Sequence, residues 1–256
     1  MQFCLQLVRR EGLSHRLQAT VFAAVAVFAG PASVVGVQRT SCPAPPPPEL
    51  REIPENLYDG VPANTYRRAQ ARERFLLGAE IPGVVRDTVS TGDPRLRLVT
   101  GTGETISLVD GTPLVENARP GSYSYRDYIA ELDVHFIELQ YYEGGAYLLV
   151  DRCTGEKAKV QARPVLSPDE RRFVTVSVDL VSHYRPNAIQ IWLHGRTYEL
   201  EFSWTPEWGP ASAEWLGADA IRVSRVVVDD RLQYQRAGFV VLRYLEGEWR
   251  VVEERP

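Results

Sequence analysis

Polar and apolar side chains alternate in short runs from Leu96 onward, and glycine-containing turns separate these runs. In Phe173–Leu180 (FVTVSVDL) and Tyr198–Trp204 (YELEFSW), apolar and polar residues occupy alternate positions. Because successive side chains of a strand point to opposite faces of a sheet, the alternation predicts strands with one buried and one solvated face. Further strands are predicted at Ile189–Leu193, Ile221–Val228, Phe239–Leu245 and Trp249–Val252, with hairpin turns at Gly101–Gly103 and Gly144–Gly145. The pattern therefore predicts an all-β domain of antiparallel meanders.

One segment departs from this alternation. In Asn64–Gly78 (NTYRRAQARERFLLG), tyrosine, alanine and leucine residues recur at the spacing of a helix face. Asn64 can cap the first turn, and Gly78 can end the helix. We therefore expect a single helix near residues 64–77, ahead of the β-rich part of the chain.

The amino-terminal segment has the order of a secretory signal peptide. Arg9, Arg10 and Arg16 precede an uncharged stretch, Leu17–Gln38, whose apolar centre is followed by small residues. We expect cleavage after Gly36, assign residues 1–37 to the leader, and predict an extracytoplasmic protein, periplasmic or secreted. The alternative is an uncleaved signal anchor that attaches the protein to a membrane, because the stretch is long enough to span a bilayer of ~30 Å.

A proline-rich segment follows the leader. Cys42–Glu49 reads CPAPPPPE, and consecutive prolines favour an extended polyproline conformation. Residues 38–55 are therefore predicted to form a spacer, and residues 56–256 a single β-rich domain with one buried core. The net charge of −4 does not supply the basic surface that binding to phosphates requires, so nucleic acid is not expected as a partner.

The strands and turns recur along the chain. Leu148–Val160, Ile189–Leu200 and Val241–Val252 each contain a strand, a polar turn with a glycine, and a second strand. A period of about 40 to 50 residues is typical of propeller blades. The segments LLVDRCTG, PVLSPDERRFVTV and IQIWLHG resemble blades of WD40-like and TolB-like β-propeller proteins, and this resemblance covers residues 134–252. The Trp–Asp ending of a true WD repeat is absent.

A closed ring of blades is not expected. Four or more blades of about 40 to 50 residues each would leave no chain for the helix. In addition, the polar stripes Thr175/Ser177/Asp179 and Glu199/Glu201 are predicted to face solvent, whereas the blades of a closed propeller pack on both faces. We therefore expect an open, partial propeller-like stack of about three meanders, or a sandwich.

Three cysteines are present, and Cys4 lies within the predicted leader. In an oxidising compartment, Cys42 and Cys153 can form a disulfide, with two free thiols as the alternative. A lipid on Cys42 is a further alternative, although Arg39 stands where a bacterial lipobox has leucine. The disulfide hypothesis places the start of the mature chain on the sheet.

The signatures of common catalytic and metal sites are missing from the sequence. It contains no Gly-x-Ser-x-Gly motif, no histidine pair with zinc spacing and no complete glycine-rich nucleotide fingerprint. We therefore expect no metal and no cofactor. His135 lies among apolar residues of a predicted strand and is interpreted as a core or rim residue, whereas His194 is interpreted as a solvated turn residue.

Two segments carry candidate ligand-binding residues. The loop within Asp179–Trp192 combines donors, acceptors and an aromatic ring between two strands, and loops on a rigid sheet often bind ligands. Trp204–Trp215 holds three tryptophans, of which one lies between two prolines and is predicted to be exposed. The candidates are Asp179, His183, Tyr184, Asn187 and Trp208. A plain hairpin connection and tryptophans in the core are the structural alternatives. The loop also resembles loops of uncharacterised bacterial exported proteins, which implies no activity.

Two functional hypotheses follow. The first is a non-catalytic binding or assembly module of the bacterial cell envelope, with a protein or a glycan as its partner. The alternative is an extracytoplasmic hydrolase that acts on glycans through two carboxylates, drawn from Asp179, Glu207 and Glu214. Glycoside hydrolysis requires two carboxyl groups about 5 to 9.5 Å apart in one cleft, so the positions of these carboxylates discriminate between the hypotheses.

Overall fold

The computed structural model describes Cys42 and residues 50–61, 65–78, 81–87, 95–111, 121–195 and 197–255. The predicted leader, the proline run after Cys42 and the proposed cap Asn64 lie outside these residues. Within them the fold is all-β with one amino-terminal helix, which confirms the predicted fold class. Helix α1 spans Thr65–Leu77, and the N–H of Gly78 donates to the carbonyl of Arg74 at 3.0 Å.

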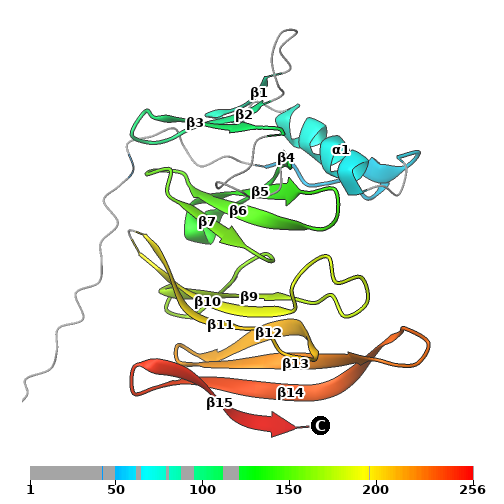
Figure 1. The fold of residues 1–256 in the computed structure, drawn as a ribbon. Helices are drawn as coiled ribbons and strands as arrows, with labels where there is room; N and C mark the ends of the chain where they lie inside the picture. Colours follow the sequence, from blue (N-terminus) through cyan, green and yellow to red (C-terminus); the bar gives the residue numbers. More distant parts are fainter. Residues whose placement is uncertain are drawn as a thin grey trace, which may run out of the picture. The chain divides into compact units, whose positions relative to one another are not determined.

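Among the described residues, the strands form four antiparallel sheets, and strands that follow one another in the chain are neighbours in each sheet (Figure 1). Sheet A consists of β1 (Val84–Asp87), β2 (Arg95–Val99) and β3 (Thr105–Val109). Sheet B consists of β4 (Ser122–Ile129), β5 (Val134–Gln140), β6 (Gly145–Asp151) and β7 (Lys157–Val160). Sheet C consists of β8 (Val165–Leu166), β9 (Arg172–Ser177), β10 (Ala188–His194) and β11 (Tyr198–Trp204). Sheet D consists of β12 (Gly209–Gly217), β13 (Ala220–Val228), β14 (Tyr234–Leu245) and β15 (Glu248–Arg255).

Most connections between neighbouring strands are short, whereas β9 and β10 are joined by the longer loop 178–187. The 3-10 turn η1 (Glu55–Tyr58) precedes α1. The 3-10 turn η2 (Ala130–Leu132) links β4 to β5. The predicted hairpin turns are confirmed, since Gly101–Gly103 lies between β2 and β3 and Gly144 immediately precedes β6. The antiparallel meander is therefore the repeating unit of the fold.

Apolar clusters lie between consecutive sheets. Examples of facing residues are Leu98 and Ile137 between sheets A and B, Leu149 and Phe173 between B and C, and Ile191 and Ile221 between C and D. Sheets B and C thus contribute side chains to two clusters each, one on either face. Each meander buries its apolar surface against the next one in the chain.

The prediction that Thr175 and Ser177 face solvent is wrong. Thr175 is 1% exposed and Ser177 is 7% exposed. On β9 these two residues share a face with Phe173, which packs in the cluster between sheets B and C. The polar stripe therefore lines the space between two sheets, and both faces of sheet C are covered.

The predicted alternation of Tyr198–Trp204 also fails at one position. The pairing of β10 with β11 shifts register between Ile191 and Trp192, so that Glu201 has no direct partner across the ladder. Leu200 is 43% exposed as a result, and Glu201 is half-buried, where its carboxylate accepts hydrogen bonds from Arg172 at 2.6 and 2.9 Å. A bulge of this kind reverses which side chains face the core.

A buried carboxylate attaches α1 to the sheets. Glu73 is 6% exposed, and its Oε1 accepts hydrogen bonds from the backbone N–H of Tyr125 and from Nη2 of Arg86, both at 2.8 Å. Arg86 also donates to the carbonyl of Tyr123 and lies 3.6 Å from Asp110. One side chain of the helix thereby binds strands of both sheet A and sheet B.

The predicted disulfide between Cys42 and Cys153 is present, with Cα atoms 5.5 Å apart. Leu50 and Ile53 pack against the cluster between sheets A and B. Cys42 and Leu50, which flank the proline run, are therefore both attached to the β-rich domain. The bonded Cys42 has no free thiol for a lipid. Disulfides persist in non-reducing surroundings, so the pairing indicates an extracytoplasmic environment.

His135 on β5 is buried, as its apolar neighbours predict. It is 2% exposed, its Nδ1 lies 3.1 Å from the hydroxyl of Tyr125, and the rings of Tyr125 and Tyr128 each lie 5.8 Å from its ring. Burial lowers the pKa of His135 to about 4, and the guanidinium of Arg152 adds to this effect. The folded protein therefore holds this imidazole neutral in mildly acidic solution.

The pH dependence of stability tests this assignment. The unfolded chain protonates His135 near pH 6.5 and the folded chain only near pH 4, so the unfolded state binds more protons between these values. The free energy of unfolding falls as pH drops through this window, by up to about 3 kcal/mol from this residue. Urea unfolding across the window should show a shallower dependence for His135→Phe than for the parent protein. Parallel curves would contradict the assignment.

Candidate functional site

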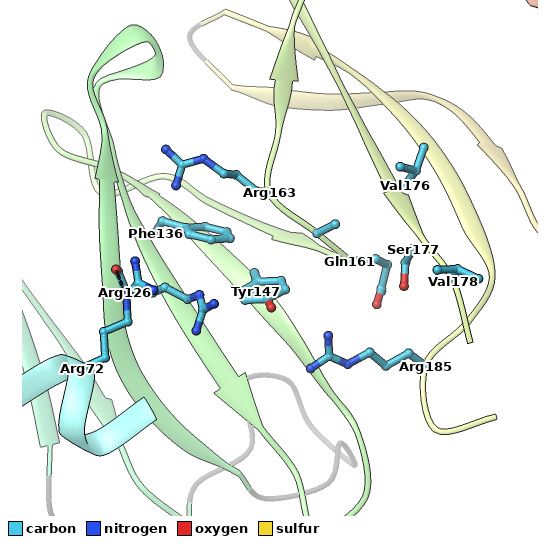
Figure 2. Close-up of a pocket in the computed structure, with 11 residues that line it drawn as sticks. Arg72, Arg126, Phe136, Tyr147, Gln161, Arg163, Val176, Ser177, Val178 and Arg185 are labelled. Carbon is cyan, nitrogen blue, oxygen red and sulfur yellow. Dashed lines mark hydrogen bonds between the residues drawn. The ribbon is translucent and has the colours of Figure 1, made fainter. Parts of the chain in front are cut away.

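A cleft of ≈ 390 Å³ lies between sheets B and C (Figure 2). Four arginines from separate parts of the chain line it: Arg72, Arg126, Arg163 and Arg185. Its lining also includes the rings of Phe136 and Tyr147. We call this site the arginine cleft.

Separate elements bring the four guanidinium groups together. Arg72 extends from α1 and Arg126 from β4, whereas Arg163 lies between β7 and β8. Arg185 comes from the loop between β9 and β10. Phe136 on β5 and Tyr147 on β6 are stacked between them, with ring centroids 4.7 Å apart at 22° (Figure 2). A rigid sheet thus supports the rings, and the arginines surround them.

The arginines pack against these ring faces. The guanidinium carbons of Arg126 and Arg185 lie 6.0 and 5.7 Å from the centre of the Tyr147 ring, and that of Arg163 lies 5.9 Å from the centre of the Phe136 ring. Cation–π contact uses the face of a guanidinium and leaves its in-plane N–H groups available. Those groups can form paired hydrogen bonds to a carboxylate or a phosphate.

Carboxylates neutralise only part of this charge. Arg126 pairs with Glu138 at 2.7 Å, and Arg163 pairs with Asp127. Among the described residues, Arg72 and Arg185 pair with no carboxylate, and Nε of Arg72 donates to the carbonyl of Arg126 at 3.1 Å. The cleft therefore holds an excess of two positive charges in a chain whose net charge is −4.

The candidate loop is organised by Asp179. Its carboxylate accepts hydrogen bonds from the backbone N–H groups of Ser182, His183, Tyr184 and Arg185 at 2.8 to 3.0 Å. Partial burial alone would raise the pKa of Asp179, but these four hydrogen bonds lower it to about 2. The amide oxygen of Asn187 accepts from the N–H of Asp179 at 2.7 Å. Asp179 and Asn187 therefore shape the loop that carries Arg185 to the cleft.

The remaining candidates occupy different positions. His183 adopts a left-handed backbone conformation with φ 55°, and Tyr184 is 56% exposed at the surface of the loop. Trp208 is half-buried against the cluster between sheets C and D, where it meets Trp204 edge to face at 5.4 Å and Arg225 at 5.1 Å. The structure thus gathers four of the five predicted residues in one loop, and Trp208 packs into a core.

The carboxylates of the hydrolase alternative do not line the arginine cleft. Asp179 is engaged by four backbone amides. Glu207 is exposed, and Glu214 lies on the surface of sheet D, 3.4 Å from Arg222. None of the three faces the cleft, whose lining among the described residues contains no carboxylate.

The sequence pattern placed only one of the four arginines, Arg185, in a candidate segment, the loop within Asp179–Trp192, and did not include it among the candidate ligand-binding residues. The other three stand far apart in the chain and share no local motif. The described part of the chain contains neither a group of histidine, cysteine or acidic residues suited to a metal ion nor a helix long and apolar enough to cross a membrane. Comparison with protein-family models, curated proteins and solved structures gave no match.

Proposed function

We propose that this protein is an exported, non-catalytic binding module of the bacterial cell envelope, and that it holds an anionic ligand in the arginine cleft. The observation that carries this proposal is the pair of guanidinium groups, those of Arg72 and Arg185, that have no carboxylate partner among the described residues of a concave site. Clefts of about 300 to 1,000 Å³ with a few polar groups that point to one centre are typical ligand sites.

The proposal of export rests on the amino-terminal pattern and the disulfide. A basic segment followed by an apolar stretch precedes Cys42, and Cys42 is bonded to Cys153. The meanders of sheets B, C and D support a relation to the blades of WD40-like and TolB-like propellers, arranged as an open stack.

Titration with citrate tests the proposed function. This small tricarboxylate should bind the purified protein with an affinity that falls as salt is added, because the interaction is between charges. Arg72→Gln and Arg185→Gln should each weaken binding about tenfold, the loss expected for one charge-assisted hydrogen bond. Isothermal titration calorimetry measures both effects.

Arg250→Gln is the matched control, because Arg250 is an exposed arginine on sheet D that pairs with Glu248. This variant should bind citrate as the parent protein does. Equal weakening in all three variants would show that citrate senses only the net charge of the protein. Absence of binding to the parent protein would contradict the proposed function.

A further inference from the structure

The arginine cleft offers more than positive charge. Its lining includes the amide of Gln161 and the hydroxyl of Ser177, and neither side chain hydrogen-bonds to another described residue. The Ser177 residue is 7% exposed, and it borders the cleft. Both side chains can donate and accept hydrogen bonds, so a ligand that brings hydroxyl groups could bind to them.

Apolar groups also line the cleft. Ala162 lies next to the polar pair, and the rings of Phe136 and Tyr147 lie among the arginines. Val176 and Val178 reach the lining as well, but Val176 packs against the cluster between sheets C and D, and Val178 lies against Gly209 of sheet D. An inorganic anion would contact the guanidinium groups alone and would make no contact with the apolar groups of the lining. The lining instead matches a ligand that combines an anionic group, neutral hydroxyl groups and short C–H surfaces.

Exposed tyrosines stand beside the cleft. Tyr142, at the tip of the β5–β6 hairpin, is 100% exposed, and Tyr184 is 56% exposed. The hairpin and the loop touch here, since a Cβ added to Gly144 would lie 2.4 Å from the carbonyl oxygen of Tyr184. Arg185 follows Tyr184 directly and points toward Tyr147 (Figure 2). Aromatic rings in the open are suited to stacking on the apolar face of a sugar ring.

We infer that the ligand is a short acidic oligosaccharide, with a sugar carboxylate on the guanidinium groups, sugar hydroxyls on Gln161 and Ser177, and a neighbouring ring against Tyr184. This inference rests on the function proposed above. The volume of ≈ 390 Å³ suits about one or two sugar rings in the cleft itself. A long polyanion is disfavoured, because the net charge of the whole chain is −4.

Calorimetric titration with four probes tests the inference: trigalacturonate, maltotriose, citrate and inorganic phosphate. Trigalacturonate should bind at least about tenfold more tightly than citrate, because it adds hydroxyl and ring contacts to the charge contact. Maltotriose, which has the same number of rings without a carboxylate, should not bind measurably. Phosphate should bind no more tightly than citrate.

Two variants separate the contributions. Arg185→Gln should weaken both citrate and trigalacturonate about tenfold. Tyr184→Ala should weaken trigalacturonate about fivefold and leave citrate unchanged, because only the sugar has a ring to stack. Tyr66→Ala is the control, since Tyr66 is 42% exposed on α1 and does not line the cleft. It should change neither affinity.

The outcomes distinguish the inference from the function on which it rests. If citrate binds through Arg185 but trigalacturonate binds no better, the ligand is not an acidic sugar and the proposed function stands. If maltotriose binds as well as trigalacturonate, the carboxylate has no role and the inference is overturned. If neither citrate nor trigalacturonate binds, both the inference and the proposed function fail.

Discussion

Replacement of Cys153 by serine is expected to lower the free energy of unfolding by about 4 to 5 kcal/mol, the largest effect we predict for a single substitution. The disulfide joins residues separated by 111 positions, and closing so long a loop removes many conformations from the unfolded chain. In the chain-entropy treatment, a loop of about 100 residues corresponds to ~4.7 kcal/mol. Chemical unfolding of oxidised protein and of the variant measures the difference.

The backbone hydrogen bonds of Cys153 do not depend on its side chain, so the loss of stability in Cys153→Ser can be assigned to the disulfide. The N–H of Cys153 donates to Asp151 at 2.9 Å, and its carbonyl accepts from Thr102 at 3.2 Å, so a serine retains these backbone bonds. Cys42→Ser should give the same loss as Cys153→Ser, and the double variant should lose no more than either. A loss below about 1 kcal/mol, or losses that add, would show that the disulfide does not constrain the unfolded chain as proposed.

Glu73→Ala is expected to destabilise the protein by about 3 to 5 kcal/mol. The substitution leaves the guanidinium of Arg86 buried without its nearest carboxylate, at 15% side-chain exposure. It also removes the acceptor for the N–H of Tyr125. Removal of one partner from a buried ion pair is costly, because the remaining charge cannot recover its hydration. Urea unfolding monitored by tryptophan fluorescence would report the change.

Two further substitutions control this prediction. Arg74→Ala alters the next residue of the same helix, which is exposed, and should change stability by no more than about 0.5 kcal/mol. Glu73→Gln keeps an acceptor for Tyr125 and should lose less than Glu73→Ala. If Arg74→Ala and Glu73→Ala were equally destabilising, the loss could not be assigned to the buried carboxylate.

The sequence pattern predicts the strands well and their surroundings less well. Period-two alternation identifies which side chains share a face of a strand, and β9, β10 and β13–β15 lie where it predicts them. It does not state what covers each face. Thr175 and Ser177 form a polar stripe that a solvated sheet would also show, yet a second sheet covers them. A stripe of small polar residues is compatible with a solvated face of a sheet and with a face that a second sheet covers.

The bulge on β11 is a second feature that the sequence pattern does not predict. Tyr198–Trp204 alternates without a break in sequence, and nothing in it signals that Glu201 has no direct partner in the ladder. The reason lies in tertiary structure: Glu201 accepts hydrogen bonds from Arg172 on β9 and from the indole N–H of Trp249 on β15. Those strands are distant in sequence, so the alternation within Tyr198–Trp204 does not predict these hydrogen bonds.

The arginine cleft likewise could not be predicted from the local sequence pattern. The loop residues Asp179 and Asn187 were identifiable because they are polar and close together, and they organise the loop. The residues that face the cleft come from a helix, a strand, a strand connection and a loop, and only the packing of sheet B against sheet C brings them together. Because the four arginines are single residues that lie far apart in the chain, no sequence motif identifies the site.

The most direct test of the proposed binding site is an NMR titration that observes the arginine side chains themselves. In ¹⁵N-labelled protein, citrate should shift the Nε–H signals of Arg72 and Arg185 first and most strongly, with smaller shifts for Arg126 and Arg163, because these four guanidinium groups line the cleft. The signal of Arg250, on sheet D, should not move. Unchanged signals of Arg72 and Arg185 at saturating citrate would contradict the account.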